Sequence, residues 1–174
     1  MSDDCTVWDI GAYGSEDSLT PIFRDPTATL KEYAFGIQTT RGIFSGSDHY
    51  GIRAVVNDTY RYIWNLTPQD TFLNVINNKG EKASRWYKSW LKAGEKDAYA
   101  AELWRRYKVC PKEELYEVKS AKWCQKNLAE DPSDKEILEG LRKELLKWMD
   151  SNGDKGAATE LMALERMWKH RKGK

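Results

Sequence analysis

The stretch "GIRAVVNDTYRYIWNL" (51–66) constrains the fold more than any other part of the sequence. It predicts two strands joined at residues 57–58, because Asn and Asp side chains tolerate the positive φ of a two-residue hairpin turn. A hairpin centred there pairs Arg53 with Tyr62 and surrounds Arg53 with aromatic rings, which favours a cation–π contact. Neither face is cleanly polar, so both are expected to be at least partly covered, by a polyanion site or by other layers of the protein.

Further strands are predicted at 32–40 ("EYAFGIQTT") and at 113–118 ("EELYEV"). Between residues 82 and 107 the apolar spacing is helical, and Gly94 divides this region into two helices. The order of elements, strands followed mostly by helices, predicts an α+β fold. We expect a small antiparallel sheet of three to four strands, packed against a C-terminal helix and accompanied by additional helices.

The C-terminal helix is predicted over 134–149 and begins at "DPSDKE". Ser133 and Glu136 have the spacing of a capping box, and Gly153 is a suitable helix stop. The apolar face of this helix should pack on the sheet. The residues expected to be among its most buried are Leu141, Leu145 and Trp148.

Composition excludes some classes of function. The chain has 174 residues, enough for one domain with a sizeable core, and a net charge of +1 with interspersed charges. No nucleic-acid or acidic-membrane partner is therefore predicted. There is no run of 18 apolar residues and hence no predicted membrane span. The acidic start "MSDDCTVWDIGAYG" is not a signal peptide, so the location of the protein stays unknown.

The residues that carry most enzyme chemistry are scarce. Two histidines and three cysteines without a Cys-x-x-Cys pair make a structural zinc site improbable, and no catalytic triad is supported. Cys110 and Cys124 flank the 113–118 strand, and whether they pair is left open. No catalytic and no metal-ligating residue is predicted.

Three stretches together resemble the C-terminal subdomain of the sulfatase family, in particular the heparan N-sulfatase (sulfamidase) and polysaccharide-sulfatase kind. They are "SLTPIF" (18–23), "EYAFGIQTTRGIFSGSDHYGIRAVVNDTYRYIWNLTP" (32–68) and "PKEELYEV" continuing to "NLAEDP" (111–132). The resemblance covers roughly residues 15–150. The chain departs from the family where an Asp-Pro pair falls on residues 121–122 and a glutamate falls on Cys124.

The resemblance implies a catalytic half that these 174 residues do not contain. In the family that half holds a calcium site and a cysteine or serine that becomes formylglycine. Cys5, Cys110 and Cys124 do not match the formylglycine signature. Calcium and formylglycine are therefore expected only in the missing half, and this chain alone should not hydrolyse sulfate esters.

The resemblance also implies a role for the loop before the hairpin. In the family the hairpin sheet packs against the catalytic domain, the terminal helix lies on its other face, and this loop points toward the substrate pocket. An Arg or His there would bind a sulfate or uronate by charge-assisted hydrogen bonds. A solvated loop without ligand stays open as an alternative. The candidate substrate-binding residues are Thr40, Arg41, Ser45, Asp48 and His49.

These expectations divide the chain into an unassigned segment (1–14), a sulfatase C-terminal-like subdomain (15–153) and a helical or frayed tail (154–174). The predicted function is a subdomain of a sulfuric ester or sulfamate hydrolase that acts on sulfated glycans; full-length relatives are typically exported or lysosomal. The alternatives are a self-standing carbohydrate- or protein-binding module derived from that subdomain, or an unrelated α+β interaction protein.

The expected partners are a sulfatase catalytic domain, or a second copy bound through an apolar patch, and a sulfated glycan. The patch is predicted on the hairpin and the first long helix, around Tyr60, Tyr62, Trp64, Trp86 and Trp90.

Overall fold

The computed structural model describes residues 20–25, 27, 31–40, 46–77, 84–121 and 123–162. The chain divides into two units, with the boundary between Ala34 and Phe35. In the first unit, helix α1 (Thr20–Arg24) is followed by a turn in which the Asp25 carboxylate accepts hydrogen bonds from the backbone N–H (2.9 Å) and the hydroxyl (2.7 Å) of Thr27. Apart from Ala34, the sheet and the remaining helices belong to the second unit.

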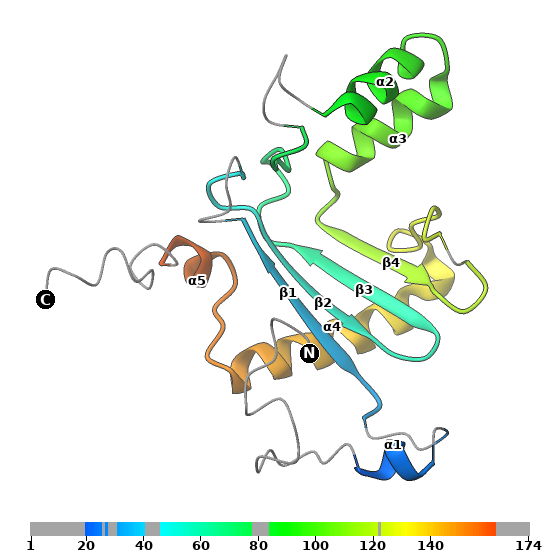
Figure 1. Cartoon of the computed structure of the whole chain (residues 1–174). Coiled ribbons are helices and arrows are strands. Elements are labelled where there is room, and N and C mark those ends of the chain that lie inside the picture. The colour runs from blue at the N-terminus through cyan, green and yellow to red at the C-terminus, as the bar shows by residue number, and fades with distance from the viewer. Residues whose placement is uncertain are drawn as a thin grey trace, which may run out of the picture. The chain divides into compact units, whose positions relative to one another are not determined.

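The second unit is built on a four-stranded antiparallel sheet, in which the strands follow one another in chain order (Figure 1). The strands are β1 (Ala34–Thr39), β2 (Gly51–Val56), β3 (Tyr60–Asn65) and β4 (Glu113–Glu117). The buried Asn65 side chain links β3 to the residues that precede β4, because its Nδ2 donates a hydrogen bond to the Pro111 carbonyl at 2.6 Å. Together with the helices, this sheet confirms the predicted α+β class.

The hairpin register differs from the prediction by two residues. Arg53 lies opposite Trp64, and the turn begins one residue later than expected. The side-chain oxygen of Asn57 explains the shift, because it accepts hydrogen bonds from the backbone N–H groups of residues 59 and 60, at 3.0 and 2.7 Å. A displacement of two leaves every side chain on its predicted face, because side chains alternate with period two.

Helix α4 (Lys135–Ser151) packs across one face of the sheet, on β2 and β3 (Figure 1). Its buried residues are Leu138, Leu141, Leu145 and Met149, and facing them on the sheet are Val55, Tyr62 and Leu115. The prediction is confirmed for Leu141 and Leu145 and wrong for Trp148. Met149 occupies the inner seam, while half-buried Trp148 stacks on Phe35 with ring centroids 4.9 Å apart.

The sequence predicted the C-terminal end of α4 correctly but not the cap at its N-terminal end. A short 3-10 turn, Pro132–Asp134, precedes the helix, and Asp131 caps this turn by accepting from both the backbone N–H and the hydroxyl of Ser133. The capping box predicted at Ser133 is therefore wrong: Asp131 caps the 3-10 turn, and Asp134, at the N-cap of α4, makes no side-chain cap hydrogen bond. Gly153 does stop the helix: its φ is +66°, and its N–H donates to the Asp150 carbonyl at 3.0 Å.

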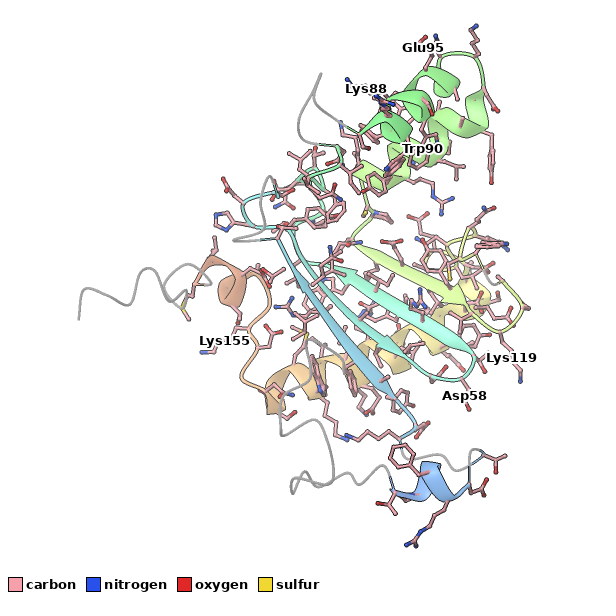
Figure 2. All side chains as sticks on the ribbon, viewed as in Figure 1. Asp58, Lys88, Trp90, Glu95, Lys119 and Lys155 are labelled. Carbon is pink, nitrogen blue, oxygen red and sulfur yellow. The ribbon has the colours of Figure 1, made fainter. Side chains whose placement is uncertain are left out.

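Helices α2 (Arg85–Gly94) and α3 (Ala98–Lys108) form the predicted pair, and they pack through aromatic side chains. Trp90 lies on the side of α2 that faces α3 (Figure 2), with its ring 5.8 Å from that of Tyr107. Tyr107 contacts Phe72 at 6.0 Å, and Phe72 contacts Tyr50 at 5.3 Å. Much of the chain's aromatic content therefore fills the join between the helix pair and the sheet. No described helix is long and apolar enough to cross a bilayer.

The sheet face opposite α4 is less covered. Among the described helices of the second unit, Figure 1 shows none across it. Half-buried apolar side chains lie on this open face, which we define as Ile52, Ala54, Val56 and Ile63; the exposed Arg61, opposite Val56, lies on the same face. In the patch predicted from the sequence, Tyr62 is wrong, because it is fully buried under α4; Tyr60 and Trp64 share its face and are half-buried. Trp86 of the same predicted patch is 50% exposed. The open face is the other side of the hairpin.

Candidate functional site

The loop predicted to bind substrate starts and ends at a tight closure between β1 and β2. Thr40 is only 2% exposed, and its hydroxyl accepts from the Tyr50 N–H and donates to the Tyr50 carbonyl, both at 3.0 Å. The Thr40 N–H also donates to the Tyr50 carbonyl, at 3.2 Å. The Thr40 side chain therefore holds the two ends of the loop together.

The second half of the loop is fixed to the segment that follows β3. The buried Ser47 hydroxyl donates to the Thr71 carbonyl at 2.6 Å and accepts from the Leu73 N–H at 2.7 Å. One turn away, the Thr67 hydroxyl donates to the His49 carbonyl at 3.1 Å. Residues 46–50 thus have a defined place at the end of the sheet where β1 finishes and β2 begins.

Of the five candidate residues, the structure brings three together at this end of the sheet. Asp48 is exposed, and His49 is half-buried beside the Thr40 closure. The Nδ1 atom of His49 is buried and has no hydrogen-bond partner among the described residues. Arg41 and Ser45 lie outside the described residues.

Beneath the loop lies a buried ionic cluster that the sequence did not predict. The Arg53 side chain is 1% exposed and pairs with Asp154 (Nε to Oδ2, 2.5 Å) and with Glu160 (Nη2 to Oε1, 2.8 Å). The other Glu160 oxygen accepts from the Thr39 hydroxyl at 2.5 Å. A Cβ at Gly51 would come within 2.5 Å of the Glu160 Cγ, so this close approach requires glycine. The cluster, comprising Thr39, Arg53, Asp154 and Glu160, ties both strand ends to the C-terminal segment.

The cluster corrects the expected role of Arg53. Its Nε and Nη2 donors point to carboxylates and its Nη1 donates to the Ile52 carbonyl at 3.0 Å, so the guanidinium serves internal partners and not a bound polyanion. A cation–π contact is made elsewhere, by Lys108 at 5.8 Å from the Trp104 ring.

The electrostatics of Asp154 follow from these contacts. Burial raises its pKa, but the hydrogen bonds from Arg53 and from the Gly156 N–H outweigh burial, and the net pKa lies below the ordinary value for aspartate. The carboxylate is therefore the stable form, as a buried partner of an arginine should be.

Little in the sequence indicates which acid pairs with Arg53. Asp154 and Glu160 lie about 100 positions later, in the segment assigned to a helical or frayed tail, where helix α5 (Ala157–Leu161) forms. The one available signal is general: an arginine in a buried strand requires a buried acceptor.

The structure also bears on metal binding and on the reactivity of two thiols. Within the described ranges, no three His, Cys, Asp or Glu side chains gather into a group that could hold a metal ion. Cys110 and Cys124 are free thiols. Burial raises the pKa of Cys110, which keeps it protonated and unreactive at neutral pH.

Comparison with known proteins gives a partial match. No protein-family profile matches the chain. Two curated relatives, each named an ulvan-active sulfatase of Formosa agariphila, are similar to it. One is 28% identical over 138 residues, which cover 79% of this chain and 25% of the relative. The other is 32% identical over 117 residues, which cover 67% of this chain and 20% of the relative. The chain therefore spans a fifth to a quarter of these relatives, and the similarity supports a sulfatase-like relationship.

Proposed function

We propose that the chain is the C-terminal subdomain of a sulfatase that acts on sulfated glycans. The observation that carries this proposal is its similarity to ulvan-active sulfatases over only 25% and 20% of their length. A segment of that size fits a subdomain that supplies packing surface and a substrate-pocket loop. Calcium and the formylglycine nucleophile belong, in this proposal, to the catalytic portion, and this chain's residues bind and orient.

The open face is where the catalytic portion would pack. Antiparallel strands with one solvated face usually alternate apolar and polar residues, yet β2 carries Ile52, Ala54 and Val56 on the face away from α4. Contiguous apolar surface of this kind marks an interaction site. Ile63, which pairs with Ala54, extends it onto β3.

The loop end would face the substrate. Asp48 is exposed and His49 half-buried on a segment held by the Ser47 and Thr67 hydrogen bonds. A sulfate or uronate group could accept a charge-assisted hydrogen bond from a protonated imidazole. Arg41 belongs to the same proposal through its place in the loop sequence.

The test is reconstitution of activity. The chain is mixed or co-expressed with the catalytic portion of one of the ulvan-active sulfatases, from which the matching C-terminal segment has been removed. Ulvan desulfation is then measured. We expect background rate from either part alone and turnover from the pair.

Variants of the chain locate the interface. Ile63→Lys places a charge on the open face and should abolish reconstitution. Leu146 on α4 is 44% exposed, so Leu146→Lys should leave reconstitution intact. Turnover by the purified chain alone, abolished by a substitution within it, would sink the proposal. So would a folded chain that never restores activity to any matched catalytic portion.

A second candidate is a self-standing carbohydrate- or protein-binding module. It is favoured by the completeness of the core, since α4 and the buried ionic cluster close one face of the sheet within this chain. A strictly monomeric chain that binds no hydrophobic dye, yet binds glycan, would support the module over the subdomain.

A further inference from the structure

A long groove runs between α3, the start of β4 and the loop 123–127. Its volume is about 1010 Å³. The side chains that matter for what it could bind are Trp90, Arg106, Tyr116, Trp123, Gln125 and Lys126. Two contacts described above belong to its lining, the Trp90–Tyr107 ring contact and the hydrogen bond from Asn65 to the Pro111 carbonyl.

The carboxylates that line the groove are already bonded within the protein. Glu102 accepts two hydrogen bonds from Arg105, both at 2.7 Å. Glu114 accepts from the Asn65 amide at 2.7 Å and from the Tyr116 hydroxyl at 2.5 Å. Glu102 is therefore neutralised by Arg105, whereas Glu114 is bonded to neutral donors and keeps its negative charge, which adds to burial in raising the pKa of the neighbouring Cys110.

Some of the donors that line the groove are only partly used within the protein. The exposed Gln125 accepts a hydrogen bond from the Tyr99 hydroxyl through Oε1 at 3.0 Å, which leaves its NH₂ group as a donor on the solvent side. Lys126 is exposed, and its charge adds to the Ser133 hydrogen bonds in lowering the pKa of Asp131. Burial and Glu114 raise the pKa of the Tyr116 hydroxyl, whereas the hydrogen bond and the charge of Arg106 lower it by less, so Arg106 is partly engaged within the protein. The groove thus offers cationic and amide donors.

An exposed indole stands at the rim. Trp123 is 76% exposed, although a large ring is ordinarily covered. A flat apolar ring beside cationic and amide donors matches a sugar ring that carries sulfate or carboxylate groups. The ring covers the apolar face of the sugar, and the donors bind the anion.

The groove begins beside the candidate substrate loop. Pro68, which lines it, follows Thr67, whose hydroxyl binds the His49 carbonyl. Tyr107, another lining residue, connects through Phe72 to Tyr50 at the base of the loop.

We propose that this groove is a second binding site, for a sulfated or uronate-bearing segment of glycan that continues from the loop along α3 and β4. The proposal rests on the proposed function for its choice of ligand. It adds a place on this chain where a polymer would be held at a distance from the reacting group.

The test uses the whole chain and a heparin-derived hexasaccharide, with a neutral glucose hexasaccharide as the matched uncharged probe. Binding is measured by calorimetry and by the indole N–H signals in NMR. Trp123→Ala and Lys126→Gln change exposed groove residues and should leave the fold intact, which circular dichroism would verify. The control variants are Trp86→Ala, at a 50% exposed indole of α2, and Lys119→Gln, near the hairpin turn and away from α3 (Figure 2).

We expect the sulfated probe to bind more tightly than the neutral one. The Lys126 variant should weaken binding about tenfold, as a charged hydrogen bond implies, and the Trp123 variant about two- to tenfold. The control variants should bind within about twofold of the parent chain. Equal losses in groove and control variants would show unspecific polyanion binding and overturn the proposal, as would a folded chain that does not bind.

Reconstitution of activity separates this proposal from the proposed function. If the pair is active but the groove variants bind and turn over like the parent, only the groove proposal fails. If the groove binds as expected while no catalytic portion is ever reactivated, the proposed function fails. Protection of the Trp123 signal by the catalytic portion, with loss of probe binding, would make the groove part of the domain interface and overturn the glycan proposal.

Discussion

At the scale of the residue, Arg53 shows how a buried charge fixes a fold. A guanidinium that is 1% exposed is tolerable only because carboxylates take its donors. The Asp154 carboxylate in turn accepts a hydrogen bond from the Gly156 N–H at 2.9 Å. This bond lies in the turn that brings Glu160 back to the sheet. Each member of the cluster is thus positioned by another, and the loss of one leaves the buried atoms that it bonded without that partner.

Replacing one carboxylate should therefore be costly. Asp154→Asn removes the partner of Arg53 Nε and should lower the free energy of unfolding by roughly 3 kcal/mol or more, as for other broken buried pairs. Urea unfolding followed by fluorescence measures this. Lys155→Gln, at the next and exposed position, should change the free energy of unfolding by less than about 0.5 kcal/mol. Similar small effects of both substitutions would show that the pair contributes no net stability.

The same carboxylate predicts a pH dependence. Because the pKa of Asp154 is lower in the folded protein than in the unfolded chain, its contribution is present above the unfolded pKa and is lost as pH falls through the folded pKa. The parent chain should lose stability between about pH 5 and pH 2, and Asp154→Asn should lose less over that window. Parallel pH profiles of the free energy of unfolding would contradict this assignment. Glu113, whose pKa is raised by burial but lowered further by Arg142 and Tyr62, should contribute in the same direction in both proteins.

At the scale of the element, the success of the sequence-based predictions follows the range of the interactions. The periodicity of α4 is local, so its inner residues Leu141 and Leu145 were predictable. The hairpin register was not, because one side-chain oxygen on Asn57 moves the turn by a residue. The end of α4 was predictable from Gly153, since only the backbone decides it.

The candidate site was predictable only where the family resemblance pointed to it. Residue spacing alone does not mark Asp48 or His49 as neighbours of a closed loop base, because Thr40 and Tyr50 meet through tertiary hydrogen bonds. The ionic cluster could not be predicted, since its acids lie about 100 positions from Arg53 in sequence.

Two adjacent leucines on α4 provide a direct test of its packing. Leu145 is fully buried against the sheet, whereas Leu146 is 44% exposed. Leu145→Ala should lower the free energy of unfolding by about 2–5 kcal/mol, the usual cost of a core cavity. Leu146→Ala should cost less than about 1 kcal/mol. A loss below about 0.5 kcal/mol for Leu145→Ala would place this helix face in solvent.

At the scale of the whole molecule, the sheet is covered unequally. Helix α4 and the buried cluster complete one side, and the open face presents Ile52, Val56 and Ile63 only half-covered. We expect a partner to cover an apolar surface of this kind, and another copy of the chain to cover it when no partner is present.

The isolated chain should therefore self-associate or bind a hydrophobic dye more than a complete globule does. Ile63→Lys should reduce both, because a buried lysine opposes pairing of the open faces, while Leu146→Lys on the α4 side should not. Sedimentation velocity and dye fluorescence measure the two effects. A sharply monomeric parent chain without dye binding would argue against the open face as an interface.

The burial of Asn65 has a practical consequence for producing the protein. The sequence Asn65-Leu66-Thr67 is an acceptor for N-linked glycosylation in a eukaryotic secretory pathway. The sugar would attach to the same Nδ2 atom that binds the Pro111 carbonyl inside the fold, where the residue is 1% exposed. A glycan added there before folding would prevent β3 from docking beside β4. Secreted expression in a eukaryote should therefore yield either an unglycosylated folded chain or a glycosylated misfolded chain. Expression in the bacterial cytoplasm adds no glycan at Asn65 and should yield the folded chain.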